Sequence, residues 1–138
     1  MLRNQEQTLG KLIDHQKIAY LSYLDQEGYP VTKAMLMTKE RDGIKTFYFS
    51  TNTSSNKVAR LRKNPQASVY FADRRFYRGV SLLGTVEVCE DQETKTRFWE
   101  DGDERYYPLG VTDPDYCILK FTAVKGRYFS NGSEDFTC

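Results

Sequence analysis

The chain has 138 residues, of which 39% are hydrophobic and 28% charged, and its formal net charge is +1. A single domain over residues 1–138 is therefore expected, with enough apolar residues for a core and without the basic excess of a nucleic-acid binder. Aromatic residues make up 14% of the chain, more than a small core needs, so we expect rings at interfaces or against a planar ligand.

The sequence carries no signal for a membrane or for a metal site. No apolar run approaches the roughly 18 to 20 residues of a membrane span, and the first residues lack the apolar segment of a signal peptide. Cys89, Cys117 and Cys138 lie far apart without CxxC spacing, which disfavours a disulfide framework or a structural zinc site. We expect a cytoplasmic protein with reduced thiols, no metal, no membrane contact and no nucleic-acid partner.

The N-terminal part predicts one helix. Apolar residues at helical spacing follow Thr8, which predicts a short amphipathic helix that is capped by Thr8 and ends before Ile18. His15, the only histidine, lies at the end of this helix, where a solvated or dipole-compensating role is more common than metal or haem ligation.

Three strands should follow. Residues 18–25 and 29–39 predict a β-hairpin closed by a tight turn at residues 26–28. Asp42-Gly43 predicts the next turn, which would pair residues 46–50 antiparallel with the strand at 29–39.

Residues 46–65, TFYFSTNTSSNKVARLRKNP, combine a strand, a polar loop and a helix. A run of hydroxyl and amide residues separates the strand from an amphipathic helix over residues 56–63, with Ser54 or Ser55 as its N-cap. The free N–H groups of such a helix start, together with Lys57 in its first turn, suit an anion such as phosphate. A capped helix without any ligand is the alternative.

The second half predicts three more strands, at residues 67–72, 79–90 and 116–128. Gly84 predicts a bulge or bend, as found where a sheet curls into a barrel. The basic and aromatic residues 73–78 fit a solvated turn better than a nucleic-acid contact, because the segment is short and isolated.

Residues 91–101 predict a charged helix that carries Trp99, and the polar tail from Ser130 is expected to fray. Together the elements predict a mainly β fold, a small closed or split barrel of six antiparallel strands with short flanking helices.

Several motifs, taken in order, also resemble those of a known family. The segments TKAMLM, FYFSTNTSSNK, KVARLRKNP, ASVYF, GVSLLGTVE and GRYFSNG look like the pyridoxamine 5′-phosphate oxidase-like family of FMN-binding split barrels. The most similar branch is that of the short flavoproteins related to general stress and nitroimidazole resistance. The resemblance implies FMN as cofactor and a homodimer with two FMN sites at the subunit interface.

The resemblance also implies which residues bind FMN. The positions that match contacts to the phosphate and the ribityl chain are Lys33, Ser50, Thr51, Asn56 and Lys57, with the candidate cap Ser55 beside them. The positions that match the backbone along the isoalloxazine edge are Ala34, Met35, Leu36 and Met37. Further positions, on a neighbouring strand, beside the flavin face or from the partner chain, are Arg78, Gly79, Trp99 and Phe129.

The sequence departs from the family pattern at three places. Many members carry Arg at the position of Lys33 and Arg or Lys at that of Asn56, so the cationic clamp is expected to be weaker here. The family's oxidases also have a C-terminal segment with substrate-binding arginine and histidine residues, for which no match is found. Oxidation of pyridoxamine phosphate is therefore not expected.

Two functions are compatible with these patterns. The first is a small FMN-dependent oxidoreductase that takes electrons from NAD(P)H and reduces a small acceptor, with no protein acid or base identified. The second is a non-catalytic flavin-binding stress or sensing protein, with haem or a deazaflavin as less favoured ligands. The aromatic excess and the apolar residues 106–109 predict a homodimer with an interface above about 2,000 Å² in either case.

Overall fold

The computed structural model describes residues 4–37 and 40–138. The helices of this part are α1 (Gln5–Asp14), α2 (Asn56–Lys63), α3 (Gln92–Arg97) and two 3-10 turns, η1 (Asp103–Arg105) and η2 (Gly110–Thr112). The strands are β1 (Ile18–Leu24), β2 (Pro30–Leu36), β3 (Arg41–Asp42), β4 (Thr46–Asn52), β5 (Gln66–Asp73), β6 (Arg78–Cys89), β7 (Tyr116–Phe129) and β8 (Ser133–Thr137).

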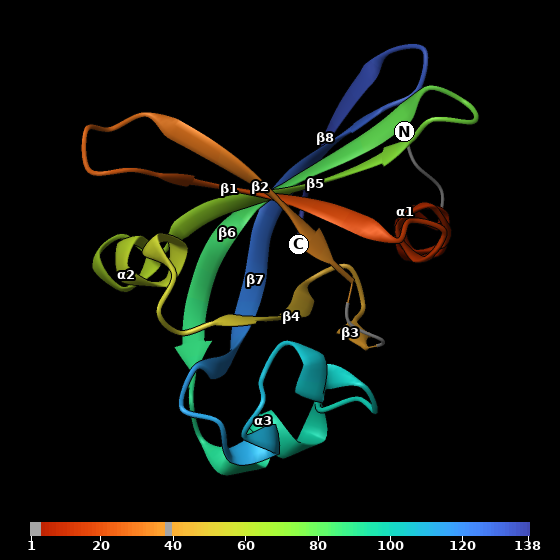
Figure 1. The fold of residues 1–138 in the computed structure, drawn as a ribbon. Helices are drawn as coiled ribbons and strands as arrows, with labels where there is room; N and C mark the ends of the chain where they lie inside the picture. Colours follow the sequence, from red (N-terminus) through yellow and green to blue (C-terminus); the bar gives the residue numbers. More distant parts are fainter. Residues whose placement is uncertain (1–3, 38–39) are drawn as a thin grey trace.

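All strands of the described residues belong to one antiparallel sheet with the order β2-β1-β5-β6-β7-β4-β3, and β8 pairs with β7 (Figure 1). The two sides of this path meet again, because β2 contacts β4 although no ladder of hydrogen bonds joins them. The result is a barrel that is split between β2 and β4. The predicted mainly β class is confirmed, whereas the predicted number of six strands is wrong.

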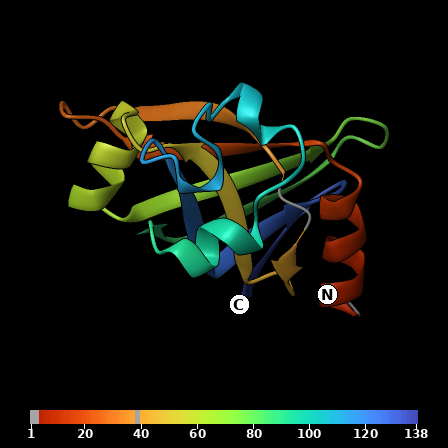
Figure 2. The same cartoon turned by 60° about the horizontal axis from the view of Figure 1, so that its bottom comes forward.

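The core fills the inside of this barrel. Its largest fully buried side chains include Phe47, Phe49, Phe71 and Phe121, and the rings of Phe47 and Phe71 lie 5.4 Å apart. Helices α1 and α2 lie at opposite ends of the sheet and cover the core with their apolar faces (Figure 2). The two helices therefore mark two separate ends of the molecule.

Strands β6 and β7 bend together at Gly84. Their pairing register shifts between Leu83 and Gly84, so the bulge predicted at this glycine is confirmed. A Cβ atom at Gly84 would collide with the backbone carbonyl oxygen of Thr122 on β7. Only glycine allows the two backbones to approach so closely here.

Two predictions for the strands are wrong, namely the partner of β4 and the length of the strand at 29–39. Strand β4 pairs with β7 along its whole length and with the short β3, and not with β2. A turn does form at Asp42 and Gly43, where Gly43 adopts φ 58°, but it joins β3 to β4. The predicted strand at 29–39 ends at Leu36, and positions 38 and 39 lie outside the described residues.

The predictions for the two ends of the chain also need correction. Helix α1 begins at Gln5 with Asn4 at its N-cap, so Thr8 lies inside the helix. The tail after Ser130 is ordered as β8, because Phe136 packs over Gly126 and the Asp135 carboxylate accepts a 2.6 Å hydrogen bond from Arg127. Side chains on both faces of β8 thus have partners on β7.

The bend gives a stability prediction. Gly84→Ala should lower the free energy of unfolding by about 2 kcal/mol or more, the cost of forcing a methyl group into packed backbone. Gly132→Ala is the matched control, since a Cβ at Gly132 would meet no atom within 4 Å. Urea unfolding of both variants measures the difference, and equal stabilities would contradict the close approach of β6 and β7.

Candidate functional site

A cavity of about 640 Å³ lies at the start of α2 and is here called the cationic cavity. Its lining residues are Tyr23, Asp25, Gln26, Glu27, Val31, Lys33, Ser55, Asn56, Lys57 and Arg60. Ser55 is the N-cap of α2, since its hydroxyl accepts the N–H of Val58 at 3.4 Å. The earlier N–H groups of the helix have no acceptor within the helix and point toward its N-terminal end. The cavity therefore combines hydroxyls, helix N–H groups and three cations.

The three cations of this cavity outnumber the two carboxylates in its lining, Asp25 and Glu27. Among the described residues, no carboxylate forms an ion pair with Lys33, Lys57 or Arg60. Partial burial, and then the positive charge of Lys33, lower the pKa of Lys57 below its usual value. The Nε atom of Arg60 is buried without a hydrogen-bond partner. A bound anion would compensate both effects.

A second, smaller cavity of about 270 Å³ adjoins the first and is here called the aromatic cavity. Its lining residues are Ala34, Met35, Leu36, Met37, Ser50, Thr51, Asn52, Lys57, Phe98, Glu100, Asp103, Tyr106 and Tyr107. Lys57 lines both cavities, so they meet at its side chain. The walls come from β2, β4 and the segment after α3, which lies below the end of β4 in Figure 1.

The segment after α3 gives the aromatic cavity its chemical character. The ring of Phe98 stacks on that of Tyr48, with 4.4 Å between the ring centroids. Only 5% of Tyr107 is exposed. Burial raises the pKa of Tyr107 to about 12, so its hydroxyl stays protonated at neutral pH and can donate a hydrogen bond. Glu100 and Asp103 add carboxylates to this wall. The cavity thus offers flat apolar surface, the phenols of Tyr106 and Tyr107, and two carboxylates.

The structure brings most of the predicted site residues together around these two cavities. Lys33, Ser55, Asn56 and Lys57 line the cationic cavity, and those lining the aromatic cavity are Ala34, Met35, Leu36, Met37, Ser50 and Thr51. Trp99 lines neither cavity and packs against Tyr107 and Tyr116 in a second core cluster.

Sequence reasoning missed Arg60 and Phe98. Arg60 lies one helical turn after Lys57 and so faces the same way, a spacing that could have indicated it. Phe98 precedes Trp99, and the choice between neighbouring aromatic residues depended on how α3 is rotated against the barrel. No local signal in the sequence gives that rotation.

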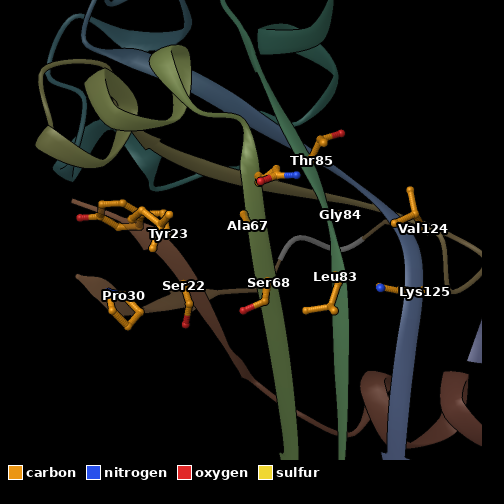
Figure 3. A pocket seen from close by; sticks show the side chains of 12 residues that line it. Ser22, Tyr23, Pro30, Ala67, Ser68, Leu83, Gly84, Thr85, Val124 and Lys125 are labelled. Atoms are coloured by element: carbon orange, nitrogen blue, oxygen red, sulfur yellow. The ribbon is translucent and has the colours of Figure 1, made fainter. Parts of the chain in front are cut away.

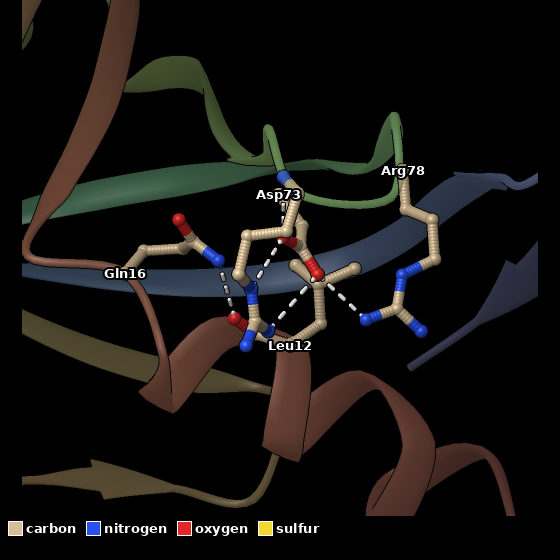
Figure 4. A network of polar contacts seen from close by, with 5 residues as sticks. Leu12, Gln16, Asp73 and Arg78 are labelled. Atoms are coloured by element: carbon tan, nitrogen blue, oxygen red, sulfur yellow. Dashed lines mark hydrogen bonds and ion pairs between the residues drawn. The ribbon is translucent and has the colours of Figure 1, made fainter.

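Three predicted residues lie elsewhere in this chain. Gly79 pairs with Phe129 across β6 and β7, and both lie beside Arg78 at the end of the barrel opposite α2 (Figure 1). Arg78 donates a 2.6 Å hydrogen bond to Asp73, which also binds Arg75, and these two arginines hold the pKa of Asp73 well below its usual range (Figure 4). Within one chain, these residues cannot reach the two cavities.

A third hollow crosses the outer face of the sheet and is here called the sheet groove (Figure 3). It measures about 560 Å³ and is lined by Ser22, Tyr23, Leu24, Pro30, Gln66, Ala67, Ser68, Leu83, Gly84, Thr85, Val124 and Lys125. Its exposed apolar residues are Leu24, Leu83 and Val124, with exposed fractions of 41%, 42% and 57%. None of the predicted FMN-binding residues lies in it.

A metal site and a membrane span are two further possibilities for the described part of the chain. No group of three or more His, Cys, Asp or Glu residues there could hold a metal ion. His15 is the C-cap residue of α1 and lines neither cavity. Among residues 4–37 and 40–138, no helix is long and apolar enough to cross a membrane.

The sequence and the fold match one family of proteins. The family model described as pyridoxamine 5′-phosphate oxidase matches residues 6–130. The chain therefore belongs to the pyridoxamine 5′-phosphate oxidase family, and its barrel is the split barrel of that family.

Individual relatives support this assignment at different levels. A Clostridium acetobutylicum protein, related to general stress protein 26 of B. subtilis and of the pyridoxinephosphate oxidase family, is 40% identical. The two structures superpose with a TM-score of 0.87 over 96% of this chain and 93% of that one. A pyridoxine/pyridoxamine 5′-phosphate oxidase of Legionella pneumophila is 31% identical over 78 residues, 56% of this chain but only 35% of the enzyme. The chain thus matches about a third of that curated relative.

A more distant structure shares the fold alone. A haem-binding protein of Mycobacterium smegmatis has a TM-score of 0.76 and 17% identity, covering 99% of this chain and 60% of that one.

Proposed function

We propose that the protein binds FMN in the two cavities that meet at Lys57. The observation that carries this proposal is that a cationic cavity and an aromatic cavity share a single half-buried lysine in their linings. FMN has the same sequence of chemical groups, a phosphate dianion joined through a polar ribityl chain to a flat ring. Arg60 adds a third cation to the cavity that would hold the phosphate.

Different residues of the chain would bind the phosphate, the ribityl chain and the ring of FMN. Lys33, Lys57 and the first N–H groups of α2 would hold the phosphate, as charge-assisted donors at a helix N-terminus do. Ser50 and Thr51 of β4 line the aromatic cavity, as Lys57 does, and would bind the ribityl chain. The end of β2 from Ala34, together with Met37 after it, would hold one edge of the ring, and the Tyr107 segment would cover it.

We further propose that the protein is an oxidoreductase. Bound FMN supplies the redox chemistry, accepting electrons from a nicotinamide cofactor and passing them on. The protein's own groups bind and orient, and the carboxylates of Glu100 and Asp103 in the aromatic cavity disfavour an anionic acceptor. A flat, weakly polar acceptor such as a quinone, a nitroaromatic or a free flavin fits this wall best.

Flavin binding without turnover and haem binding are the competing functions. The described residues offer haem no histidine at either cavity, since His15 is at the end of α1. The absorbance spectrum of the purified protein separates these ligands, and we expect the two flavin bands. Bleaching of these bands by NADH or NADPH, followed by rapid recovery with a quinone, would support the enzyme. A Soret band would contradict the proposed cofactor, and stable flavin bands under NAD(P)H would contradict turnover.

The cationic cavity gives a prediction for affinity. Lys57→Ala and Lys33→Ala should each weaken FMN binding by roughly 1.5 to 3 kcal/mol, the range for hydrogen bonds to charged groups. Riboflavin, which lacks the phosphate, should bind the unmodified protein far less tightly and lose little more in either variant. Quenching of flavin fluorescence measures all of these dissociation constants.

Lys63→Ala is the matched control for this experiment. Lys63 ends the same helix but lines neither cavity, so FMN affinity should be retained. Equal affinity of the unmodified protein for riboflavin and FMN would remove the phosphate site from the proposal.

We also propose that the protein is a homodimer. Arg78, Gly79 and Phe129 cannot reach the cavities of their own chain, so they would act at the site of a second copy across the sheet groove. Leu83→Glu places a charge in that groove and should dissociate the dimer, whereas the exposed Lys11→Glu on α1 should not. Light scattering coupled to size exclusion measures the mass, and a monomer at all concentrations of the unmodified protein would contradict this proposal.

A further inference from the structure

Asp115, directly before β7, holds the polar loop that leads into α2. Its carboxylate accepts two hydrogen bonds from this loop, from Ser54 N at 2.8 Å and from Asn52 Nδ2 at 2.9 Å. Its backbone carbonyl accepts a third, from Thr53 N at 2.8 Å. Asn52 at the end of β4 and the loop residues Thr53 and Ser54 are therefore held by one residue that is more than 60 positions away in sequence.

Asp115 is itself held in place from the other side. Its N–H donates to Asp113 Oδ1 at 2.9 Å, and Asp113 also accepts the N–H of Leu109 at 3.1 Å. The buried Lys95 donates to the carbonyl oxygen of Asp113 at 2.9 Å. Because only 5% of Asp113 is exposed, the hydrogen bonds that hold Asp115 have little freedom to move.

The loop held by Asp115 ends at the cap of α2. Ser55 N donates to Asn52 O at 3.1 Å, so the position of Asn52 also sets that of the cap. The cap in turn sets the direction of the first N–H groups of the helix and the start of the Lys57 side chain. We propose that Asp115 is a positioning residue for the anion site at the start of α2, an inference that depends on FMN binding there.

Whether removal of Asp115 weakens or tightens FMN binding distinguishes a positioning role from a simple charge effect. Hydrogen bonds from Asn52 and Ser54 lower the pKa of Asp115, so it is a carboxylate at neutral pH. A negative charge beside a phosphate site repels the ligand, and removing it should tighten FMN binding if charge alone mattered. If Asp115 acts by positioning the loop, its removal should weaken FMN binding instead.

The test compares Asp115→Ala and Asp115→Asn by fluorescence titration with FMN and with riboflavin. We expect Asp115→Ala to weaken FMN at least tenfold and riboflavin less than threefold. Asp115→Asn keeps an acceptor for Ser54 N, so it should recover most of the loss although it lacks the charge. Recovery by the amide is a result that a charge effect would not give.

Asp91→Ala is the matched control, because Asp91 caps α3 in the same manner, accepting from Thr94 N at 3.0 Å and from Thr94 Oγ1 at 2.7 Å. It should lower stability without changing the ratio of FMN to riboflavin affinity. Amide hydrogen exchange in the ligand-free protein gives a second readout, with faster exchange at Ser54 and Val58 in Asp115→Ala only.

Three results would overturn the inference. Tighter or unchanged FMN binding in Asp115→Ala would show that charge dominates or that the loop holds itself. Equal losses for FMN and riboflavin would show general destabilisation, and unchanged exchange at Ser54 would show that Asp115 does not hold the loop. Failure of the unmodified protein to bind FMN is a different result, and it would overturn the proposed function together with this inference.

Discussion

The candidate site depends on one electrostatic arrangement, the approach of Lys33 to the half-buried Lys57. Within the described residues, no carboxylate pairs with either lysine, and both burial and the like charge lower the pKa of Lys57. Burying an ammonium group near a second one costs free energy unless an anion arrives. A phosphate would turn the same arrangement from a destabilising feature into a binding site.

The barrel imposes this arrangement on residues far apart in sequence. Lys33 lies on β2, and Lys57 lies in α2 directly after β4. Along the sheet, the strands β1, β5, β6 and β7 separate β2 from β4. They meet because the sheet curls until β2 contacts β4, and the bulge at Gly84 contributes to that curl. The loop between β4 and α2 is then fixed from β7 by Asp115. The local sequence forms the N-terminus of α2, and the barrel brings Lys33 and Asp115 to it.

What could be predicted from the sequence follows the range of each interaction. The cap of α2, predicted at Ser54 or Ser55, and the bulge or bend predicted at Gly84 are indicated by local residue types, and the structure shows Ser55 as the cap and a bulge at Gly84. The partner of β4 was wrong because a strand of aromatic residues fits any adjacent strand, and only closure of the barrel selects β7. The tail was predicted to fray because the fit of Phe136 over Gly126 is a long-range contact. Trp99 was predicted at the site instead of Phe98 because the packing of α3 against the barrel is also a long-range contact.

The central claim, that the two cavities on either side of Lys57 form one flavin site, is tested most directly by a crystal structure of the protein with FMN. The claim predicts the phosphate against Lys57 and the first N–H groups of α2, with the ring between the Ala34–Met37 strand and Tyr107. It would be contradicted by a phosphate at Arg78 of the same chain, or by a ring lying in the sheet groove beside Leu83.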